Sequence, residues 1–306
     1  MNNPLISVVL CTYNGGRFID EQLNSILNQT YIHLEIIISD DFSSDNTYEI
    51  LKKHVEKDKR IRLFRNEKNI GFNLNFKEAC SKASGELIAF ADQDDIWLPE
   101  KLERMIAGWK GNVPLMYCNS VRFADKQPPV KVRHYPGYRR FEGTDSRKLS
   151  VFNTVSGHAM IIKKNLLQMT PVFLPGIFYD WQLAAIAACN GGVGYIEDIL
   201  VFQRVHDSNI TIRERFDPKS KESKLLFSQM VEQHLAAFSS IPNMPVAHVQ
   251  YFSRLISLWS SGANKKFSWP LFFFLFKNRK LVFNYKKRIF SFFSHLKHCY
   301  RLTANY

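Results

Sequence analysis

Short apolar runs alternate with amphipathic stretches through the first hundred residues of this 306-residue chain. Four of the runs have the length of strands that are buried on both faces, and the first is rich in β-branched residues. They are Ile6–Cys11, Leu34–Ser39, Ile61–Phe64 and Leu87–Ala91. Between them, apolar residues recur at three- and four-residue steps, which is the spacing of a helix with one buried side. This alternation predicts parallel βαβ units and an α/β fold.

The second half of the chain has a less regular pattern. It predicts strands at Leu115–Phe123 and Ser156–Ile162, a loop at Asp125–Gly143, a helix at Ile177–Ala188, and one or two strands in Gly194–Val205. Beyond residue 220 the pattern is helical throughout. We therefore divide the chain into an α/β domain at 1–215 and a helical region at 216–306.

Polar and acidic residues gather in the loops that follow three of the predicted strands. The loops are Thr12-Tyr13-Asn14, Asp40-Asp41 and Asp92-Gln93-Asp94-Asp95. Open α/β sheets bind ligands at the carboxyl ends of their strands. The sequence therefore predicts a binding site at this edge of the sheet.

The acidic loop Asp92–Asp95 is the strongest chemical signal in the chain. Three carboxylates within four residues repel one another unless water or a cation neutralises them. Oxygen ligands on a loop suit Mg²⁺ or Mn²⁺, which bind through few carboxylates and also coordinate a substrate diphosphate. The alternative is a solvated acidic turn before the helix that begins at Pro99. The strand end and the apolar residues on both sides favour the metal site.

The loop at Asp40 and Asp41 is a second acidic candidate. A carboxylate at a strand end can accept the ring N–H of a uracil or thymine base. The alternative is a cap for the next helix, but Ser44 or Asp45 can serve as that cap. One of the two aspartates then remains for ligand binding.

Taken together, these motifs resemble glycosyltransferase family 2. The resemblance covers about the first 110 residues and rests on four segments in order: Ser7–Asn14, Ile38–Thr47, Asn66–Asn73 and Asp92–Asp95. It implies the GT-A fold, a Rossmann-like mixed sheet, and sugar transfer from a nucleoside-diphosphate donor with inversion at the anomeric carbon. The forms N-x-G-F-N-x-N-F and A-D-Q-D-D-I-W resemble members that build bacterial capsule or O-antigen, including rhamnosyl transferases.

The resemblance also implies roles for individual residues. The donor-binding residues it implies are Thr12, Tyr13, Asn14, Asp40, Asp41, Asn69, Asn75, Asp92 and Gln93. Asp94 is the expected ligand of Mg²⁺ or Mn²⁺. His206, which follows the last predicted strand, is the expected second metal or diphosphate ligand, and a purely structural histidine is the alternative.

An inverting transferase needs a general base for the acceptor hydroxyl. The family places an acidic residue at a helix start after the D-x-D motif, and Asp180 opens an apolar helix in this way. The alternatives are that Asp180 only caps that helix, or that Glu197 or Asp198 is the base. Further residues expected near the acceptor or in support of the site are Asp95, Trp97, His158, Trp181 and Arg204. Arg204 could counter phosphate charge, and His158 is either an acceptor contact or a packed histidine.

The basic residues are concentrated at the end of the chain. Of the formal net charge of +13, eleven charges lie after Glu232, where the sequence has no Asp or Glu. Apolar residues recur at helical steps among these cations: Val282, Tyr285, Ile289, Phe292, Phe293 and Leu296. An amphipathic helix of this kind suits the surface of an anionic membrane. The alternative is that these helices pack on the α/β domain or on a second subunit.

The longest apolar run, Pro270–Phe276, has seven residues, whereas a membrane-spanning helix needs roughly 20. The first residues are expected to form a strand and not a signal peptide, and five scattered cysteines suit a reducing cytosol.

We therefore expect an enzyme at the inner face of the cell membrane. Its expected substrates are a UDP- or dTDP-sugar and a lipid-linked glycan, and it can be an oligomer of identical chains. The alternatives are a catalytically silent sugar-binding relative and a basic nucleic-acid-binding protein. The sequence shows no nucleic-acid-binding motif, so we expect no nucleic-acid partner.

Overall fold

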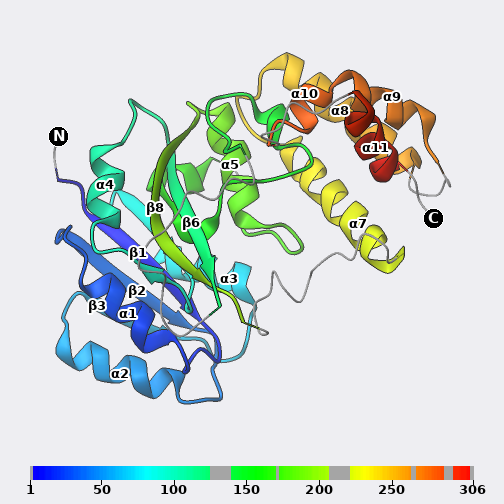
Figure 1. Ribbon diagram of the computed structural model, residues 1–306. Helices are drawn as coiled ribbons and strands as arrows, with labels where there is room; N and C mark the ends of the chain where they lie inside the picture. The colour runs from blue at the N-terminus through cyan, green and yellow to red at the C-terminus, as the bar shows by residue number, and fades with distance from the viewer. Residues whose placement is uncertain are drawn as a thin grey trace.

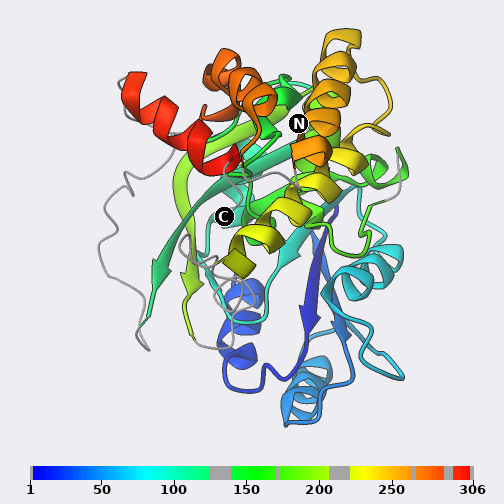
Figure 2. The same cartoon turned by 90° about the vertical axis from the view of Figure 1, so that its right-hand side faces the viewer.

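The computed structural model describes residues 3–124, 139–169, 172–206, 221–262, 267–285 and 292–303. A single mixed sheet of eight strands lies at the centre, with helices on both of its faces and further helices beyond one face (Figures 1 and 2). Most of the predicted loop at 125–143 lies outside the described residues. The same holds for part of the basic tail, namely Lys265, Lys266, Lys286, Lys287, Arg288 and Ile289.

The strands and helices follow the alternation predicted for the first hundred residues. The strands are β1 (Ile6–Thr12), β2 (Leu34–Asp40), β3 (Ile61–Arg65), β4 (Leu87–Ala91), β5 (Ile96–Trp97), β6 (Leu115–Phe123), β7 (Met160–Lys163) and β8 (Val193–Arg204). The first helices are α1 (Ile19–Leu27), α2 (Thr47–Lys57), α3 (Phe72–Ser81), α4 (Lys101–Ala107) and α5 (Tyr179–Cys189). The later helices are α7 (Lys221–Phe238), α8 (Val246–Gly262), α9 (Trp269–Lys277), α10 (Arg279–Val282) and α11 (Phe292–Thr303). Three short 3₁₀ turns are η1 (Ser146–Leu149), η2 (Gly157–Ala159) and η3 (Lys164–Gln168).

The strand order brings the polar loops to one edge of the sheet. The order is β3-β2-β1-β4-β7-β6-β8-β5. The first four strands in this order pair in parallel, so that Thr12 at the end of β1 stands opposite Asp40 at the end of β2. β7 runs antiparallel to β4 and β6, and β5 runs antiparallel to β8. The predicted α/β class with a mixed sheet is confirmed.

Each face of the sheet is covered by its own set of helices. Val8 points to the side of α1, where it packs in one cluster with Leu23. The next residue, Val9, points to the opposite side and joins a cluster with Phe76 of α3 and Leu183 of α5. Because neighbouring residues of a strand face opposite ways, a strand buried on both sides reads as a continuous apolar run.

The C-terminal helices extend the core on the α3 and α5 side. Leu235 and Phe238 of α7 and Phe252 of α8 are fully buried in the same cluster as Leu183. The rings of Phe238 and Trp181 meet at the junction, with centroids 6.2 Å apart. Within the described residues, none of the helices combines the length and the hydropathy that a membrane span requires.

Two local predictions differ from the structure. The segment Ser156–Ile162 is not a single strand, because residues 157–159 form the turn η2 and β7 begins only at Met160. The apolar spacing from Val282 to Leu296 does not correspond to one helix, because α10 ends at Val282 and α11 begins at Phe292. At η2 the reason is tertiary, because the Gly157 N–H donates to Asp180 and His158 Nε2 bonds to Ser120 Oγ, contacts that a regular strand would not make.

A pair of phenylalanine variants tests whether the C-terminal helices share the core of the sheet. Phe238→Ala removes a side chain with no exposed surface and should lower the free energy of unfolding by about 3–5 kcal/mol. Phe273→Ala removes a ring that is 61% exposed and should change it by less than about 0.5 kcal/mol. Denaturant unfolding followed by circular dichroism measures both. A separate, earlier transition for the C-terminal helices in Phe238→Ala would contradict a shared core.

Candidate functional site

The loops after β1 and β2 are tied together by hydrogen bonds. Thr12 Oγ1 donates to Asp40 Oδ1 over 3.0 Å. Asn14 has a left-handed backbone (φ 49°), and its N–H donates to Ser43 Oγ over 2.9 Å. An asparagine tolerates this conformation better than most residues. The expected donor-binding residues Thr12, Asn14 and Asp40 therefore lie together at the carboxyl edge of the sheet.

A second link joins this loop to the acidic loop after β4. The Tyr13 N–H donates to Gln93 Oε1 over 2.8 Å, and Gln93 Nε2 donates back to the Tyr13 carbonyl over 3.2 Å. The Tyr13 side chain is 48% exposed. An aromatic face with this exposure can stack on a planar base. Both residues lie where the sequence predicts the donor.

The carboxylate of Asp41 accepts hydrogen bonds from the protein itself. It is buried and accepts hydrogen bonds from Asn66 Nδ2 and from the N–H groups of Ile70 and Gly71, at 2.8 to 2.9 Å. Gly71 has a positive φ of 85°, a conformation that glycine adopts without strain. Asp41 thus fixes the turn that starts α3. Asp40 is also buried, and it accepts a hydrogen bond from the Ser43 N–H. Both aspartates that the sequence predicts to bind the uracil or thymine base therefore accept hydrogen bonds from the protein itself.

Asn75 and Asn69, which the sequence predicts to contact the nucleotide-sugar donor, form hydrogen bonds within the protein. Asn75 is buried, its Nδ2 donates to the Ser39 carbonyl over 2.9 Å, and its Oδ1 accepts from Asn66 over 3.0 Å. Asn75 therefore stabilises the end of β2, and its amide group is bonded to the protein and not directed at a nucleotide sugar. Asn69 lies in the same turn, where its Oδ1 accepts from the Gly71 N–H over 3.2 Å.

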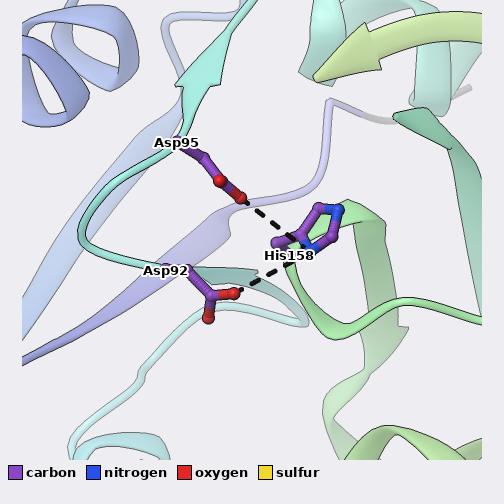
Figure 3. A group of neighbouring side chains, drawn as sticks. All are labelled: Asp92, Asp95 and His158. Carbon is purple, nitrogen blue, oxygen red and sulfur yellow. Dashed lines mark ion pairs between the residues drawn. The ribbon is translucent and has the colours of Figure 1, made fainter. Parts of the chain in front are cut away.

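The inner part of the acidic loop faces a histidine from η2 (Figure 3). The Nδ1 atom of His158 lies 3.8 Å from Oδ2 of Asp92 and 3.8 Å from Oδ2 of Asp95. These three side chains place one ligand atom each within 4.8 Å of one another. On the other side of the ring, Nε2 bonds to Ser120 Oγ at 3.0 Å. We name Asp92, Asp95 and His158 the inner group.

Burial controls the charge of the inner group. It lowers the pKa of His158 to about 3, with Lys101 adding to the effect, so that the ring is neutral at pH 7. Burial and the neighbouring charges of Asp92 and Asp94 raise the pKa of Asp95 well above its usual range. Partial removal of the Asp92 carboxyl from water, together with the charges of Asp94 and Asp180, raises its pKa to about 7, although 43% of the side-chain surface is exposed. Asp95 Oδ2 is buried and has no hydrogen-bond partner among the described residues. A proton or a cation on that oxygen would satisfy it.

Asp94 and His206 come together on the outer side of the loop, as the sequence predicts. Asp94 Oδ2 and His206 Nε2 are 2.7 Å apart. Their side chains are 13% and 16% exposed, against 1% for Asp95 and 43% for Asp92 of the inner group. We name Asp94 and His206 the outer pair. Carboxylate oxygen and imidazole nitrogen are a donor set that fits a divalent cation such as Mn²⁺.

Arg204 does not have the position expected of a phosphate-binding residue. It is buried, its Nε donates to the Asp94 carbonyl over 3.0 Å, and its Nη2 pairs with Glu21. Its guanidinium also lies 4.8 Å from the Phe18 ring and 4.6 Å from the Phe123 ring. Its backbone N–H donates to Asp95 over 3.1 Å. Arg204 therefore holds the acidic loop in place.

Lys101 is a buried lysine that no motif in the sequence singled out. It has no exposed surface, its Nζ donates to the His158 carbonyl over 2.9 Å, and it lies 3.1 Å from the centre of the Trp97 ring. Burial lowers the pKa of Lys101 to about 7. The sequence contains one signal for Lys101. A lysine in the first turn of a helix is unfavourable with the helix dipole, so its position in α4 indicates that another interaction stabilises it.

The two tryptophans expected near the acceptor are buried. Trp97 lies under Lys101 and is 2% exposed. Trp181 is 4% exposed, and its Nε1 donates to the Leu149 carbonyl over 2.6 Å. Both therefore support the site from inside the protein and do not face an acceptor.

Asp180 lies at the start of α5, close enough to Asp92 for its charge to raise the pKa of that carboxyl. Its Oδ1 accepts from its neighbour's N–H, that of Trp181, over 2.6 Å, and its Oδ2 accepts from the Gly157 N–H over 3.3 Å. A Cβ atom at Gly157 would collide with the ring of Tyr179, so a larger residue there would displace that side chain. Burial raises the pKa of Asp180 to about 6. By contrast, Asp198 forms an ion pair with Arg104 at 2.8 Å.

Known proteins with similar sequences are named as glycosyltransferases. Residues 7–169 match the family model described as glycosyl transferase family 2. The glycosyltransferase GlyG of Streptococcus pneumoniae is 39% identical over 231 residues, which are 75% of this chain and 68% of that protein. An Escherichia coli protein named UDP-Glc:alpha-D-GlcNAc-diphosphoundecaprenol beta-1,3-glucosyltransferase WfgD is 40% identical over 121 residues, which are 39% of this chain and 47% of WfgD. This chain matches about a third to a half of the length of several curated relatives.

Solved structures show the same fold at low identity. Residues 1–349 of Staphylococcus aureus TarS in complex with UDP-GlcNAc superpose with a TM-score of 0.62 at 17% identity, covering 97% of this chain and 89% of the other. A mannosyltransferase of Pyrobaculum calidifontis in complex with GDP-Man and Mn²⁺ gives a TM-score of 0.57 at 18% identity, covering 85% and 72%. The mixed sheet is thus of the same architecture as in these transferases.

Proposed function

Because the chain belongs to glycosyltransferase family 2, we propose that it transfers a sugar from a nucleoside-diphosphate donor to a glycan hydroxyl, with inversion at the anomeric carbon. One observation carries the proposal. Asp180 stands at a helix start within electrostatic reach of the acidic loop that ends β4. Donor site and base thereby share one edge of the sheet.

The donor would lie over the carboxyl ends of β1, β2 and β4. Tyr13 offers an exposed ring for the base, and Asp92, the most accessible acid of the loop, faces the same edge. The outer pair, Asp94 and His206, would hold Mg²⁺ or Mn²⁺. The ion, when bound, neutralises charge on the leaving diphosphate. The inner group is less suited to this task, because Asp95 is too deeply buried for a diphosphate to reach an ion bound there.

The reaction needs one proton acceptor. Asp180 takes the proton of the acceptor hydroxyl while that oxygen forms its bond to C1 of the sugar. The bond between C1 and the diphosphate oxygen breaks, and its electron pair leaves with the nucleoside diphosphate. The raised pKa of Asp180 suits a base that works near neutral pH. No covalent intermediate with the enzyme is required.

The names of two relatives support the acceptor class. WfgD is named for a diphosphoundecaprenol-linked acceptor and for UDP-glucose, and TuaG of Bacillus subtilis for teichuronic acid biosynthesis. UDP-GlcNAc occupies the TarS structure. We therefore propose a UDP- or dTDP-sugar as the donor and a lipid-linked glycan of bacterial surface polysaccharide synthesis, capsule or O-antigen, as the acceptor.

A lipid-linked acceptor agrees with a patch of exposed aromatic rings on α9 and α11. Five rings between 47% and 77% exposed form it: Trp269, Phe273, Phe292, Phe293 and Tyr300. Within it, the rings of Trp269 and Phe273 lie 5.8 Å apart, and so do those of Phe292 and Phe293. The half-buried Phe276 of α9 contacts Phe292 at 5.2 Å. We name these five residues the aromatic patch. Soluble monomers rarely expose so much contiguous aromatic surface without a partner.

Charge supports an anionic lipid surface as the proposed partner of the aromatic patch. Lys277, Lys297 and Arg301 are exposed on α9 and α11, and Lys280 is exposed on the short helix α10. The sequence after Glu232 contains no acidic residue. Aromatic rings and cations on one side of a helix pair match the interface of an anionic leaflet. Each basic residue near such a surface contributes roughly 1 kcal/mol. We propose peripheral binding at the inner face of the cell membrane.

Two asparagine variants locate the metal ion. Asp94→Asn should weaken Mn²⁺ binding at least about tenfold and abolish metal-dependent transfer, because the ion loses a charged ligand. Asp95→Asn should leave the Mn²⁺ affinity within about threefold. Electron paramagnetic resonance titration of Mn²⁺ with the purified variants measures both. The reverse order of effects would place the ion in the inner group.

The pH profile tests the base. Because the pKa of Asp180 is raised to about 6, the carboxylate forms as pH rises through that value, and kcat should rise with it and then level off. Asp180→Asn should lower kcat about 10²- to 10⁴-fold and keep nucleotide binding. Because the pKa of Asp180 is raised in the folded protein, its contribution to the free energy of unfolding falls as pH rises from about 4 to 6. Asp180→Asn should therefore be at least as stable as the parent at pH 8. Full transfer activity in Asp180→Asn would exclude this base.

Vesicle binding tests the aromatic patch. Phe273→Ser combined with Phe293→Ser should lower binding to vesicles containing phosphatidylglycerol about tenfold or more, because both rings lose their place in the interface. Binding of the parent should weaken with added salt. Ile32→Ser, which changes a side chain 77% exposed on the loop between α1 and β2, is the matched control and should bind as the parent does. Equal binding by the double variant would rule out the patch as the docking surface.

A further inference from the structure

The segment before α5 is held from two sides. On one side, Asn73 of α3 donates its Nδ2 hydrogens to the carbonyls of Leu174 and Ile177, over 2.9 and 2.7 Å. On the other side, His234 of α7 accepts a hydrogen bond from the Phe178 N–H over 2.9 Å. Two residues after Phe178 comes Asp180. The contact with α7 therefore connects the C-terminal helices to the start of the helix that presents the proposed base.

The hydrogen bonds of His234 define its tautomer. Its Nδ1 lies 2.7 Å from the Met230 carbonyl, and a carbonyl can only accept, so Nδ1 carries the proton. Nε2 is then unprotonated and accepts from Phe178. The residue has no exposed surface, and burial lowers its pKa to about 4, so it stays neutral at pH 7. The acceptor on Nε2 is thus permanent under physiological conditions.

The ring of His234 also packs against the first turn of α5. Its centroid is 4.3 Å from that of Trp181 and 5.8 Å from that of Phe178. Phe178 is the residue at the N-cap of α5 and has no side-chain oxygen that could cap the helix. A helix end of this kind relies on outside partners for its backbone groups. His234 supplies one such partner and fixes the rotation of the first turn through its ring.

We propose that His234 is a positioning residue of the transfer reaction: from α7 it sets the start of α5 so that Asp180 faces the acidic loop. The inference rests on the proposed function, because it takes Asp180 as the base. It makes the C-terminal helices a part of the active site although His234 itself touches no substrate. A purely structural role, in which His234 only fills the core, would change stability and leave the reaction parameters of the folded enzyme unaltered.

Two substitutions separate the hydrogen bond from the packing. His234→Phe keeps a ring against Trp181 and removes the acceptor for the Phe178 N–H. His234→Gln removes the ring and keeps an acceptor. We expect His234→Phe to lower kcat about ten- to a hundredfold, since a displacement of about 1 Å at a reacting group has effects of this size. The KM for the donor and the affinity for the nucleoside diphosphate should stay within about twofold. His234→Gln should restore a large part of kcat.

His248 of α8 offers a matched control. It is another buried histidine of the C-terminal helices, bonded to Ser146 Oγ at 2.9 Å. His248→Phe should destabilise the fold to a similar extent and leave kcat unchanged. The acid limb of the kcat profile, set by Asp180, should shift in His234→Phe, whose base has a changed environment, and stay in place in His248→Phe. Thermal unfolding of each variant shows that the folded enzyme is being compared.

The outcomes separate this inference from the proposed function. Equal kcat and an equal pH profile in His234→Phe and the parent would overturn the positioning role, and so would an equal loss in His248→Phe. If Asp180→Asn keeps full activity, the assignment of the base fails and the inference fails with it. If Asp180→Asn is inactive and His234→Phe is normal, only the inference fails. Should His234→Phe not fold, His234→Asn, too short to reach Phe178, carries the same comparison.

Discussion

Several carboxylates are forced together at one edge of the sheet, and the surrounding structure is arranged to hold them there. Burial raises the cost of ionising Asp92 and Asp95, and the charge of Asp94 adds to that cost at both. Lys101, which has no exposed surface, opposes it from below. Such an arrangement costs stability in the free protein. It is useful where a cation and a proton are to be bound, which agrees with the proposed transfer reaction.

The turn η2 connects the two halves of this charged centre. Its Gly157 N–H donates to Asp180, its His158 ring faces Asp92 and Asp95, and the His158 carbonyl accepts from Lys101. Two consecutive residues, Gly157 and His158, thereby link the donor-side acids, the proposed base and the buried lysine. The short turn in place of the predicted strand has a physical reason, because a regular strand could not direct a backbone N–H and a side chain to these partners at once.

The C-terminal helices face two environments. Leu235, Phe238 and Phe252 continue the core of the sheet, and the aromatic patch on α9 and α11 points away from it. Figure 2 shows these helices lying over one side of the molecule, apart from the first helices of the chain. The packed side, through α7, reaches the start of α5. The same region therefore both packs against the site and exposes the aromatic patch.

The sequence by itself determined the alternation of strands and helices, the acidic loops at strand ends, and the cation-rich end of the chain. These features follow from local periodicity and from motifs of adjacent residues, so no distant contact is needed to recognise them. Only the tertiary structure decided which polar side chains are already occupied. Asp41, Asn75 and Arg204 look like ligand-binding residues in the sequence, but their hydrogen bonds are taken by backbone groups and side chains elsewhere in the fold. Lys101 and His234 gain their importance from partners 57 and 56 residues away. The pairing of hydrogen-bond donors with acceptors over such distances depends on how the chain packs, and a local pattern does not contain that information.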